Sequence, residues 1–418
     1  MVVSSARERP VEWLPWLWNP THSLMLSLLF LLLADDPTFH LRTVRGKEVS
    51  GPLVTLDAQG NLELGGKVRR KIAADDWLWL HRDRAKLPEL PRGAHLILAD
   101  GARIPFLEVR LKGDDLLIRH PDLGEALVAI PLSAVKMLWR TSLEGEALAE
   151  RTRRAWLSLR PTRDQLRLRN GDLIEGTLEA LGETVSVERD RKTLSIAWST
   201  LSAIVLSVDG LRPPPGGPFL RAIVLPSSRS PGGRFTLCSA KCEGAELVAK
   251  TSFGATLRVG LERLARLERL PTAEQTLALP LSILPGRRYR YASFLDEQMP
   301  LGVDATPRGR DLRLNGHTWE RGLSMAVGGE VTLPLEGKYQ RFEALVGLDD
   351  LEGATGRAKV VLLVEDKPVP LTPRDLLGEP IRITCELKGA KSLTLRVEAA
   401  GRGPVRGIVN WVDAWLIR

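Results

Sequence analysis

Four pairs of adjacent carboxylates are the first candidates for chemistry in this sequence. Glycoside hydrolysis needs two carboxyl groups that face each other across the scissile bond. Neighbouring residues of a strand point to opposite faces, so an adjacent pair does not supply that arrangement by itself. Aspartates also accept hydrogen bonds from backbone N–H groups in turns, and we interpret most of the pairs in that way. The pairs are Asp35-Asp36, Asp75-Asp76, Asp114-Asp115 and Asp349-Asp350.

The histidines and cysteines form no catalytic or metal-binding motif that we recognise. No two histidines have the spacing of zinc ligands, and the sequence has no HExxH, CxxC, phosphate-loop or GxSxG motif. We therefore expect no metal, no cofactor and no enzymatic activity. Three cysteines cannot all pair, and we interpret them as small, half-buried hydrophobic residues. The residues concerned are His22, His40, His81, His95, His120 and His317, with Cys238, Cys242 and Cys385.

The net charge is basic. Lys and Arg number 59 against 51 for Asp and Glu, which gives +8. Such a surplus favours nucleic acid or another acidic polymer as a partner. Here the surplus lies upstream of residue 271, is scattered, and comes without a motif that combines basic and aromatic residues. We therefore expect a mildly basic surface and no nucleic-acid partner.

The N-terminus has the pattern of an export signal. Leu24 to Ala34 form a short apolar core, Arg7 and Arg9 precede it, and Asp35-Asp36 follow it. The core is too short to span a bilayer as a helix, and the pattern predicts a signal peptide over residues 1–34. The protein is then exported, to the periplasm, the cell envelope or the extracellular space. Two alternatives remain: a helix buried in the first domain, and an uncleaved signal that anchors the protein in a membrane.

Residues 39–270 have the pattern of repeated small β-units. Each of four stretches contains short strand-like runs separated by turn residues, and the dipeptides Asp100-Gly101 and Asn170-Gly171 are strong hairpin signals. We expect two small SH3-like or Sm-like barrels in residues 39–140 and two more in residues 166–270. Protein partners are expected to bind through these barrels. The alternative is one irregular β-domain. The four stretches are 41–64, 95–120, 166–189 and 222–247.

One segment predicts a helix between the second and third units. Residues 143–158, inside an insertion over 141–165, carry acidic residues early and arginines late, as the helix dipole favours. Glu150 is spaced to pair with Arg153 and Arg154 along the same helix.

The last part of the chain carries an ordered series of motifs and resembles a known family. The motifs in residues 281–418, in the order in which they occur, resemble those of the NPCBM family of carbohydrate-binding modules. The resemblance covers about a third of the chain. The resemblance implies a galactose-binding-like jelly-roll β-sandwich. The motifs are Ser293 to Asp296, Leu314-Asn315-Gly316 with Trp319, Arg321-Gly322-Leu323, Tyr339 with Arg341-Phe342, Val346 to Asp350, Leu387 to Ala390, and Asn410 to Ala414.

The residue pattern agrees with that fold but departs from the family at polar positions. Val331, Leu333 and Leu335 recur with a period of two, as apolar residues of half-buried strands do. The family usually has a histidine where this chain has Ala326. It usually has Asp-His-Ala-Asp-Trp where this chain has residues 407–411, Gly-Ile-Val-Asn-Trp. We therefore expect weak ligand binding.

Sugar recognition needs flat aromatic faces for C–H surfaces and carboxylate and amide groups for hydroxyls. By strand alternation, Trp411, Asp413 and Trp415 share one face, which we expect to be exposed. The alternative is that Trp411 lies in the core and that Asp349-Asp350 cap a turn. The candidate carbohydrate-binding residues are Trp319, Arg321, Asp349, Asp350, Asn410, Trp411, Asp413 and Trp415.

The function that these patterns favour is that of an exported, non-catalytic protein which binds carbohydrate or glycoconjugate through its C-terminal sandwich. Two other classes remain open. In the first, the protein is a structural or protein-interaction component of the cell envelope, and its sandwich has lost sugar binding. In the second, it is an accessory chain of a separate glycosidase.

The export hypothesis predicts cleavage after Ala34. N-terminal sequencing of the protein from its native host should start at Asp35 or within a few residues of it. A mature protein that retains Met1 or Met25 would contradict cleavage.

Overall fold

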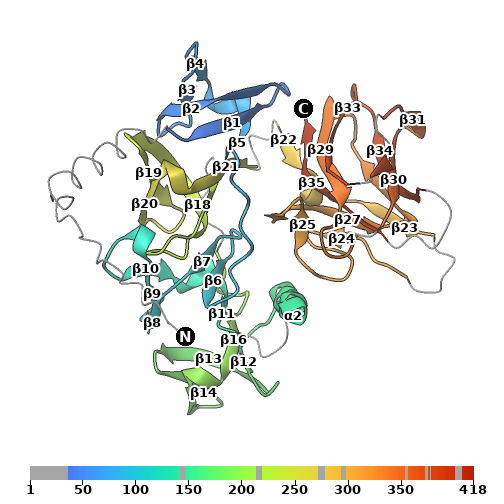
Figure 1. The fold of residues 1–418 in the computed structure, drawn as a ribbon. Helices are drawn as coiled ribbons and strands as arrows, with labels where there is room; N and C mark the ends of the chain where they lie inside the picture. Colours follow the sequence, from blue (N-terminus) through green and yellow to red (C-terminus); the bar gives the residue numbers. More distant parts are fainter. Residues whose placement is uncertain are drawn as a thin grey trace, which may run out of the picture. The chain divides into compact units, whose positions relative to one another are not determined.

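The computed structural model describes residues 36–418 except for 142–145, 213–218, 272–277, 293–297, 354–355, 372–374, 377 and 401–406. The expected signal peptide and the motif from Ser293 to Asp296 lie outside the described residues. Strands dominate the described chain (Figure 1), so the predicted all-β class is confirmed. Within this part of the chain, no helix has the length and apolar character needed to cross a bilayer.

Residues 38–270 form four consecutive antiparallel units, here called units I to IV. In units I, III and IV the first strand pairs with both the fifth and the second strand. The second strand then pairs with the third, and the third with the fourth. The strands of unit I are β1 (Thr38–Thr43), β2 (Glu48–Leu56), β3 (Leu62–Leu64), β4 (Arg70–Ile72) and β5 (Trp77–Arg82). Those of unit III are β12 (Asp164–Leu168), β13 (Leu173–Leu181), β14 (Thr184–Arg189), β15 (Lys192–Ala197) and β16 (Leu201–Val205). Those of unit IV are β17 (Phe219–Val224), β18 (Gly233–Glu243), β19 (Glu246–Thr251), β20 (Thr256–Gly260) and β21 (Leu264–Leu270).

Unit II is a variant of this plan with one more strand. Its last strand pairs with its first, but its middle strands form a separate sheet in the order β10-β9-β8. The strands are β6 (His95–Leu98), β7 (Arg103–Pro105), β8 (Glu108–Lys112), β9 (Asp115–Arg119), β10 (Val128–Pro131) and β11 (Val135–Trp139).

Local turn chemistry explains why the four units look alike. The hairpin glycines Gly101 and Gly171 have φ of 87° and 93°, a conformation that costs glycine little. Beside them the side chains of Asp100 and Asn170 accept hydrogen bonds from the backbone N–H two residues on. A single 3-10 turn leads into each last strand: η1 (Ala74–Asp76), η3 (Leu132–Ala134), η4 (Trp198–Thr200) and η5 (Leu261–Arg263). Two further such turns are η2 (Pro121–Leu123) and η6 (Leu281–Ile283).

The units are joined to one another through their last strands. The last strand of unit I, β5, pairs with β21 of unit IV, and β11 of unit II pairs with β16 of unit III. Backbone hydrogen bonds therefore connect unit I to unit IV and unit II to unit III, so the four units are not separate closed barrels. Whether each unit is an SH3-like or Sm-like barrel stays a prediction.

The predicted helix lies between units II and III. Helix α2 (Glu146–Ser158) is shorter than the expected 143–158, and residues 143–145 lie outside the described chain. Ala149, Trp156 and Leu157 pack against an apolar cluster around Trp139 of β11. The cluster also contains Ala203 and Val205 of β16, so the apolar side of the helix is attached to both unit II and unit III.

The C-terminal part is a β-sandwich of two six-stranded sheets. One sheet has the order β24-β27-β35-β29-β33 with β22 also on β35, and the other has β23-β28-β34-β30-β31 with β32 on β30. Both sheets contribute side chains to one core, for example Phe342 from the first and Leu395 from the second. The first sheet contains β22 (Ala278–Pro280), β24 (Gly302–Val303), β27 (Gly322–Ala326), β29 (Arg341–Leu348), β33 (Ile381–Glu386) and β35 (Ile408–Ile417). The second contains β23 (Arg288–Tyr291), β28 (Gly329–Pro334), β30 (Ala358–Val364), β31 (Lys367–Val369), β32 (Asp375–Leu376) and β34 (Ser392–Ala399).

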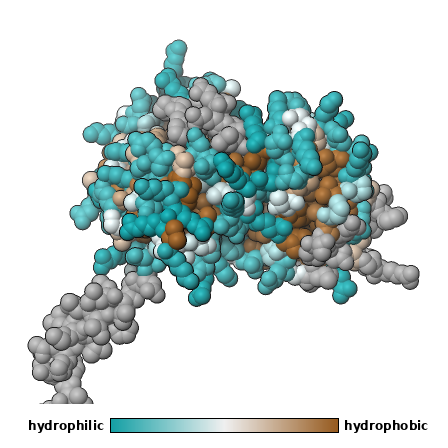
Figure 2. Space-filling view, turned by 90° about the horizontal axis from the view of Figure 1, so that it is seen from above, coloured by the Kyte–Doolittle hydropathy of each residue, from teal (hydrophilic) through white to brown (hydrophobic). Residues whose placement is uncertain are grey.

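A small hairpin lies outside these sheets, made by β25 (Leu312–Leu314) and β26 (His317–Trp319). Leu312 and Leu314 pack on Val412 of β35, so the hairpin is held against the first sheet. Hydrophilic residues cover most of the molecular face seen in Figure 2, and apolar residues show between them in patches.

Candidate functional site

The eight residues predicted to bind carbohydrate fall into three separate places. Trp411 is fully buried in the sandwich core, as the alternative interpretation had it. Three polar residues form a hydrogen-bond network around the β25–β26 hairpin. The remaining four lie where the sandwich contacts units I and IV. The structure therefore does not bring the eight together into one site. The network contains Asp349, Asp350 and Asn410, and the contact contains Trp319, Arg321, Asp413 and Trp415.

A β-bulge separates Trp411 from the other two residues of the expected face. Trp411 lies opposite Val346, and Trp415 lies opposite Glu343, so that Asp413 and Ala414 together oppose Ala344. Asp413 has φ of 45°, in the left-handed region. One extra residue reverses the alternation of a strand beyond it. The prediction of one shared, exposed face is therefore wrong: Trp411 points into the core, and Asp413 and Trp415 lie on the other side of the sheet.

The polar network around the β25–β26 hairpin holds backbone turns in place. Asp350 accepts hydrogen bonds from the backbone N–H groups of Asn315 and Gly316, both at 2.8 Å. Asp349 accepts from the N–H groups of Leu351 and Glu352 at 3.0 and 2.8 Å. The Asn410 amide, which is fully buried, donates to Asp349 at 2.7 Å. All these groups bond within the protein and hold the hairpin and the chain after β29.

Asp413 is the centre of the contact between the sandwich and the upstream units. Its carboxylate bonds to Arg266 of β21 at 2.6 Å and to Arg382 of β33 at 2.8 Å. Its side chain is 0% exposed. Burial by itself would raise the pKa of Asp413, but the two guanidinium groups outweigh it and hold the pKa well below its usual range. Trp415 donates its indole N–H to the same carboxylate at 3.0 Å.

Aromatic rings from both parts of the chain enclose Arg266. Its guanidinium carbon lies 4.7 Å from the ring centre of Trp79 in β5 and 5.4 Å from that of Trp319 in the sandwich hairpin. Trp415 packs beside them, against Leu78 and Trp79 of unit I. Cation–π contacts of this kind are favourable when they are removed from water. Trp319 and Trp415 are therefore packed against protein rather than open to a ligand.

The cavity at this contact is too small for a sugar. Trp319, Arg321, Asp413 and Trp415 all line it, but its volume is about 30 Å³. The buried Ser282 Oγ, Trp319 Nε1 and Arg321 guanidinium each have a polar atom without a hydrogen-bond partner. A polar cavity of this size accommodates water. The geometry thus fits one or two bridging waters and excludes a monosaccharide ring.

The positions at which the sequence departs from the family pattern come together at one end of the first sheet. Ala326 of β27 pairs directly with Ile408 of β35, and the N–H of Val327 bonds to the carbonyl of Gly407 at 3.0 Å. The side chain of Leu348 approaches Gly407 from β29. Among the described residues, this end of the sheet is therefore lined by apolar side chains where the family usually has polar ones.

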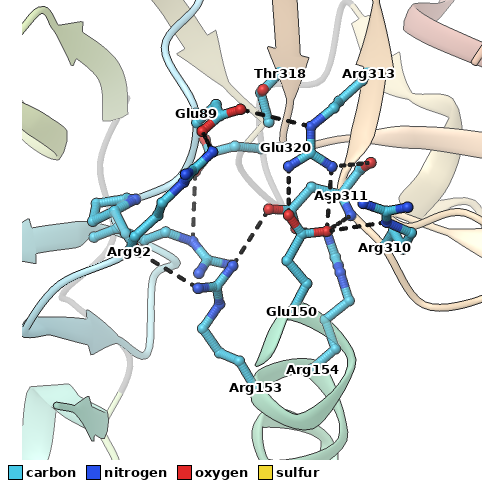
Figure 3. A network of polar contacts seen from close by, with 12 residues as sticks. Glu89, Arg92, Glu150, Arg153, Arg154, Arg310, Asp311, Arg313, Thr318 and Glu320 are labelled. Atoms are coloured by element: carbon cyan, nitrogen blue, oxygen red, sulfur yellow. Dashed lines mark hydrogen bonds and ion pairs between the residues drawn. The ribbon is translucent and has the colours of Figure 1, made fainter. Parts of the chain in front are cut away.

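Sequence reasoning missed a second polar cluster, which joins α2 to the sandwich (Figure 3). Glu150 bonds to Arg313 and accepts from the N–H of Asp311 at 3.0 Å, while Arg153 and Arg154 both bond to Asp311, at 3.3 and 2.7 Å. The expected pairing of Glu150 with Arg153 and Arg154 along the helix is therefore wrong. The spacing rule finds neighbours on one helix, but here Glu150 pairs with Arg313 of β25, and both arginines pair with Asp311, the residue before β25. A cavity of about 210 Å³ lies beside the cluster.

The cysteines and potential metal ligands give no further site within the described residues. Cys238, Cys242 and Cys385 are all free. No three side chains of His, Cys, Asp or Glu in this part of the chain are placed to hold a metal ion.

The sandwich is matched by a family model. The model of the NPCBM/NEW2 domain matches residues 288–417. The C-terminal sandwich is an NPCBM/NEW2 domain. The match covers less than a third of the chain, and the family description therefore applies to the sandwich and not to units I–IV. No curated protein matches the chain.

Solved structures of CBM51 domains are among those similar to the chain. A CBM51 from Clostridium perfringens GH95, in complex with methyl-galactose, is 21% identical over 33% of this chain and 99% of its own, with a TM-score of 0.30. The structure of CBM51-2 in complex with GlcNAc and the INT domains of Clostridium perfringens ZmpB is 19% identical. It covers 41% of this chain and 36% of its own, also with a TM-score of 0.30. The tandem CBM51 modules of the Streptococcus pneumoniae family 98 glycoside hydrolase are 10% identical over 81% of this chain and 96% of their own, with a TM-score of 0.29. Because these TM-scores are low, we base the fold of the NPCBM/NEW2 domain on its own strand order.

The ion pairs of Asp413 make a first prediction about stability. Asp413→Asn keeps the shape of the side chain but leaves Arg266 and Arg382 without their common counter-charge. Removing one partner of a buried ion pair typically costs about 3–5 kcal/mol. We expect a loss of that size in the free energy of unfolding measured with urea. The exposed Glu246 serves as control, since Glu246→Gln should change it by no more than about 0.5 kcal/mol. A small effect of Asp413→Asn, equal to that of the control, would contradict the role assigned to the contact.

The histidine beside this contact makes a second prediction, about pH. Burial lowers the pKa of His81 to about 3, and the charges of Arg266 and His317 act in the same direction. An unfolded histidine titrates near pH 6.5, so between pH 6.5 and 3 the unfolded state binds the additional proton and stability falls as the pH falls. At pH 5 the cost from His81 is about 2 kcal/mol. Urea unfolding at pH 7 and pH 5 should show a smaller difference for His81→Gln than for the unchanged protein; an equal difference would disprove the assignment.

Proposed function

We propose that this protein is an exported, non-catalytic carbohydrate-binding protein. The observation that carries the proposal is the NPCBM/NEW2 domain at residues 288–417, whose strands form a complete two-sheet sandwich with a single core. Family membership of the sandwich supports binding to a glycan or glycoconjugate. Export is supported by the apolar core from Leu24 to Ala34 and its flanking charges.

Binding should be weak at the end of the sheet where the family pattern has polar groups. Ala326, Gly407 and Ile408 stand there in this chain and offer no side-chain hydrogen bond. A hydrogen bond to a neutral or charged group contributes about 0.5–3 kcal/mol. The loss of such groups therefore lowers affinity by tenfold or more relative to a sandwich that retains them.

The state of the buried carboxylates supports a non-catalytic role. Glycosidases need one carboxylic acid whose pKa is raised so that it can donate a proton. Arginines hold the pKa of Asp311 and Asp413 below the usual range, although burial alone would raise it. Burial does raise the pKa of Glu352, but the neighbouring Asp349 already accepts several hydrogen bonds and supports a turn. Asp349 is therefore not a free second carboxylate for Glu352.

A structural or protein-interaction role is the second candidate, and one observation favours it. The outer face of the first sheet, with Asp413, Trp415 and Glu343, is packed against units I and IV instead of facing solvent. The sandwich then acts as one wall of a larger β-structure. In this alternative it binds no glycan, and the protein interacts with partners of the cell envelope through other surfaces.

Calorimetric titration of the full chain with oligosaccharides that end in galactose or GlcNAc distinguishes the two candidates. We expect binding with a millimolar dissociation constant, and no release of reducing sugar on prolonged incubation. Bovine serum albumin at the same concentration controls for unspecific heat. The absence of binding to every glycan at millimolar concentration would remove the carbohydrate proposal and favour the structural role.

A further inference from the structure

We propose that His81 and His317 form a pH-sensitive contact, which holds the β25–β26 hairpin against the upstream strands at neutral pH and opens more readily in mild acid. His81 lies on β5 of unit I, and His317 lies on β26 of the hairpin. The centres of the two rings are 5.8 Å apart. Residues 83–94, here called the connecting segment, lead from β5 to β6 and bond to the hairpin beside this pair. The inference goes beyond carbohydrate binding and does not depend on it.

The ring of His317 is a hydrogen-bond acceptor for the connecting segment. The N–H of Leu87 donates to Nδ1 of His317 at 3.1 Å, and the N–H of Thr318 donates to the carbonyl of Leu87, also at 3.1 Å. Because a backbone N–H can only donate, Nδ1 carries no proton in this arrangement. Protonation of His317 makes both ring nitrogens donors and removes the acceptor. Leu87 is 2% exposed, so its N–H is then left unpaired away from water, which is costly.

Charges on the neighbouring elements disfavour a proton on His81. In the sheet it lies directly opposite Arg266 of β21 and opposite His40 of β1. Burial lowers the pKa of His81 to about 3, and the charges of Arg266 and His317 act in the same direction. Asp413 of β35 opposes this shift, but its carboxylate already bonds to two guanidinium groups. A proton on His81 is therefore poorly compensated while the contact is closed.

The surroundings of His317 have the same effect. Burial lowers the pKa of His317, and the charges of Lys86 in the connecting segment and Arg266 in β21 lower it further. Asp350, which follows β29, opposes the shift. Its carboxylate, however, already accepts two backbone hydrogen bonds from the turn of the hairpin. The carboxylates near both histidines are thus engaged with other groups.

The direction of the pH dependence follows from these shifts. When the contact opens, His81 returns to water and to a pKa near 6.5. The open state then binds the additional proton, so opening is favoured as the pH falls. Between pH 7 and pH 5 the opening equilibrium rises about twentyfold through His81 alone. The ion pairs of Asp413 and Glu320 keep their charge in this range, because arginines hold the pKa of both carboxylates low although burial opposes it.

Hydrogen exchange of the full chain at pH 7 and pH 5, corrected for the intrinsic exchange rate at each pH, measures this opening. The N–H groups of Leu87 and Thr318 report on it, because their hydrogen bonds cross the contact. Leu395 of β34, in the sandwich core, reports on unfolding of the sandwich itself. We expect the protection of Leu87 and Thr318 to fall at least about tenfold from pH 7 to pH 5. Leu395 should be the better protected at both pH values.

The variant H81Q/H317N removes both titrating rings, and the asparagine oxygen still offers an acceptor to the N–H of Leu87. We expect it to be protected at pH 7 like the unchanged protein and to lose less than about threefold at pH 5. The matched control is H40Q. His40 lies opposite His81, but its ring bonds to Asp83 and Ser50. H40Q should therefore lose protection as the unchanged protein does.

Three results would overturn the inference. The first is unchanged protection of Leu87 and Thr318 in the natural sequence at pH 5. The second is protection equal to that of Leu395, since all three amides then exchange only when the whole sandwich unfolds. The third is an equal loss in H81Q/H317N, which assigns the pH dependence to other groups. If the double variant does not fold at pH 7, the single variants H81Q and H317N give the same test, because each should retain only part of the pH dependence.

Discussion

The buried ion pairs between the sandwich and the upstream strands are the interaction on which the rest of the structure depends. Asp413 and Glu343 come from the sandwich, and their partners Arg266 and Arg42 come from units IV and I. Removing such charges from water is costly, and the cost is recovered only when each carboxylate is fully hydrogen-bonded. Both carboxylates meet this condition, since Arg382 and Arg341 supply a second guanidinium to each. The relative placement of the two β-structures is thereby set by a few short, directional bonds.

These pairs also explain the uneven distribution of charge along the chain. The basic surplus lies upstream of residue 271 and shows no cluster typical of nucleic-acid binding. In the folded protein several of those arginines are buried and face carboxylates of the sandwich. Arg234 and Arg221 of unit IV, for example, lie 3.3 and 3.9 Å from Glu320. Part of the surplus is thus internal, and it reflects the matching of two surfaces of one chain rather than an external partner.

The same packing changes what the NPCBM/NEW2 domain offers to a ligand. Trp319 and Trp415 have the aromatic area that sugar binding requires, but Arg266 lies over the Trp319 ring and Trp415 packs with Trp79. At the end of the first sheet, Ala326 and Ile408 have replaced polar groups. In this chain the upstream strands therefore do more than carry the sandwich, since they cover two of its tryptophans.

The sequence by itself determined the all-β class, the tight turns at Gly101 and Gly171, and the two-sheet sandwich, because these depend on local turn chemistry, on alternation and on an ordered series of motifs. Alternation assigns faces only while a strand stays regular, and the bulge at Asp413 reversed it within β35. Local sequence patterns also could not show which face of the first sheet is covered. The covering residues Trp79 and Arg266, which contact Trp415 and Asp413, come from far upstream in the chain. For the same reason Arg153 and Arg154 pair with Asp311 instead of with Glu150. Tertiary structure alone decided these points, because the burial of a charge depends on partners that no sequence window contains.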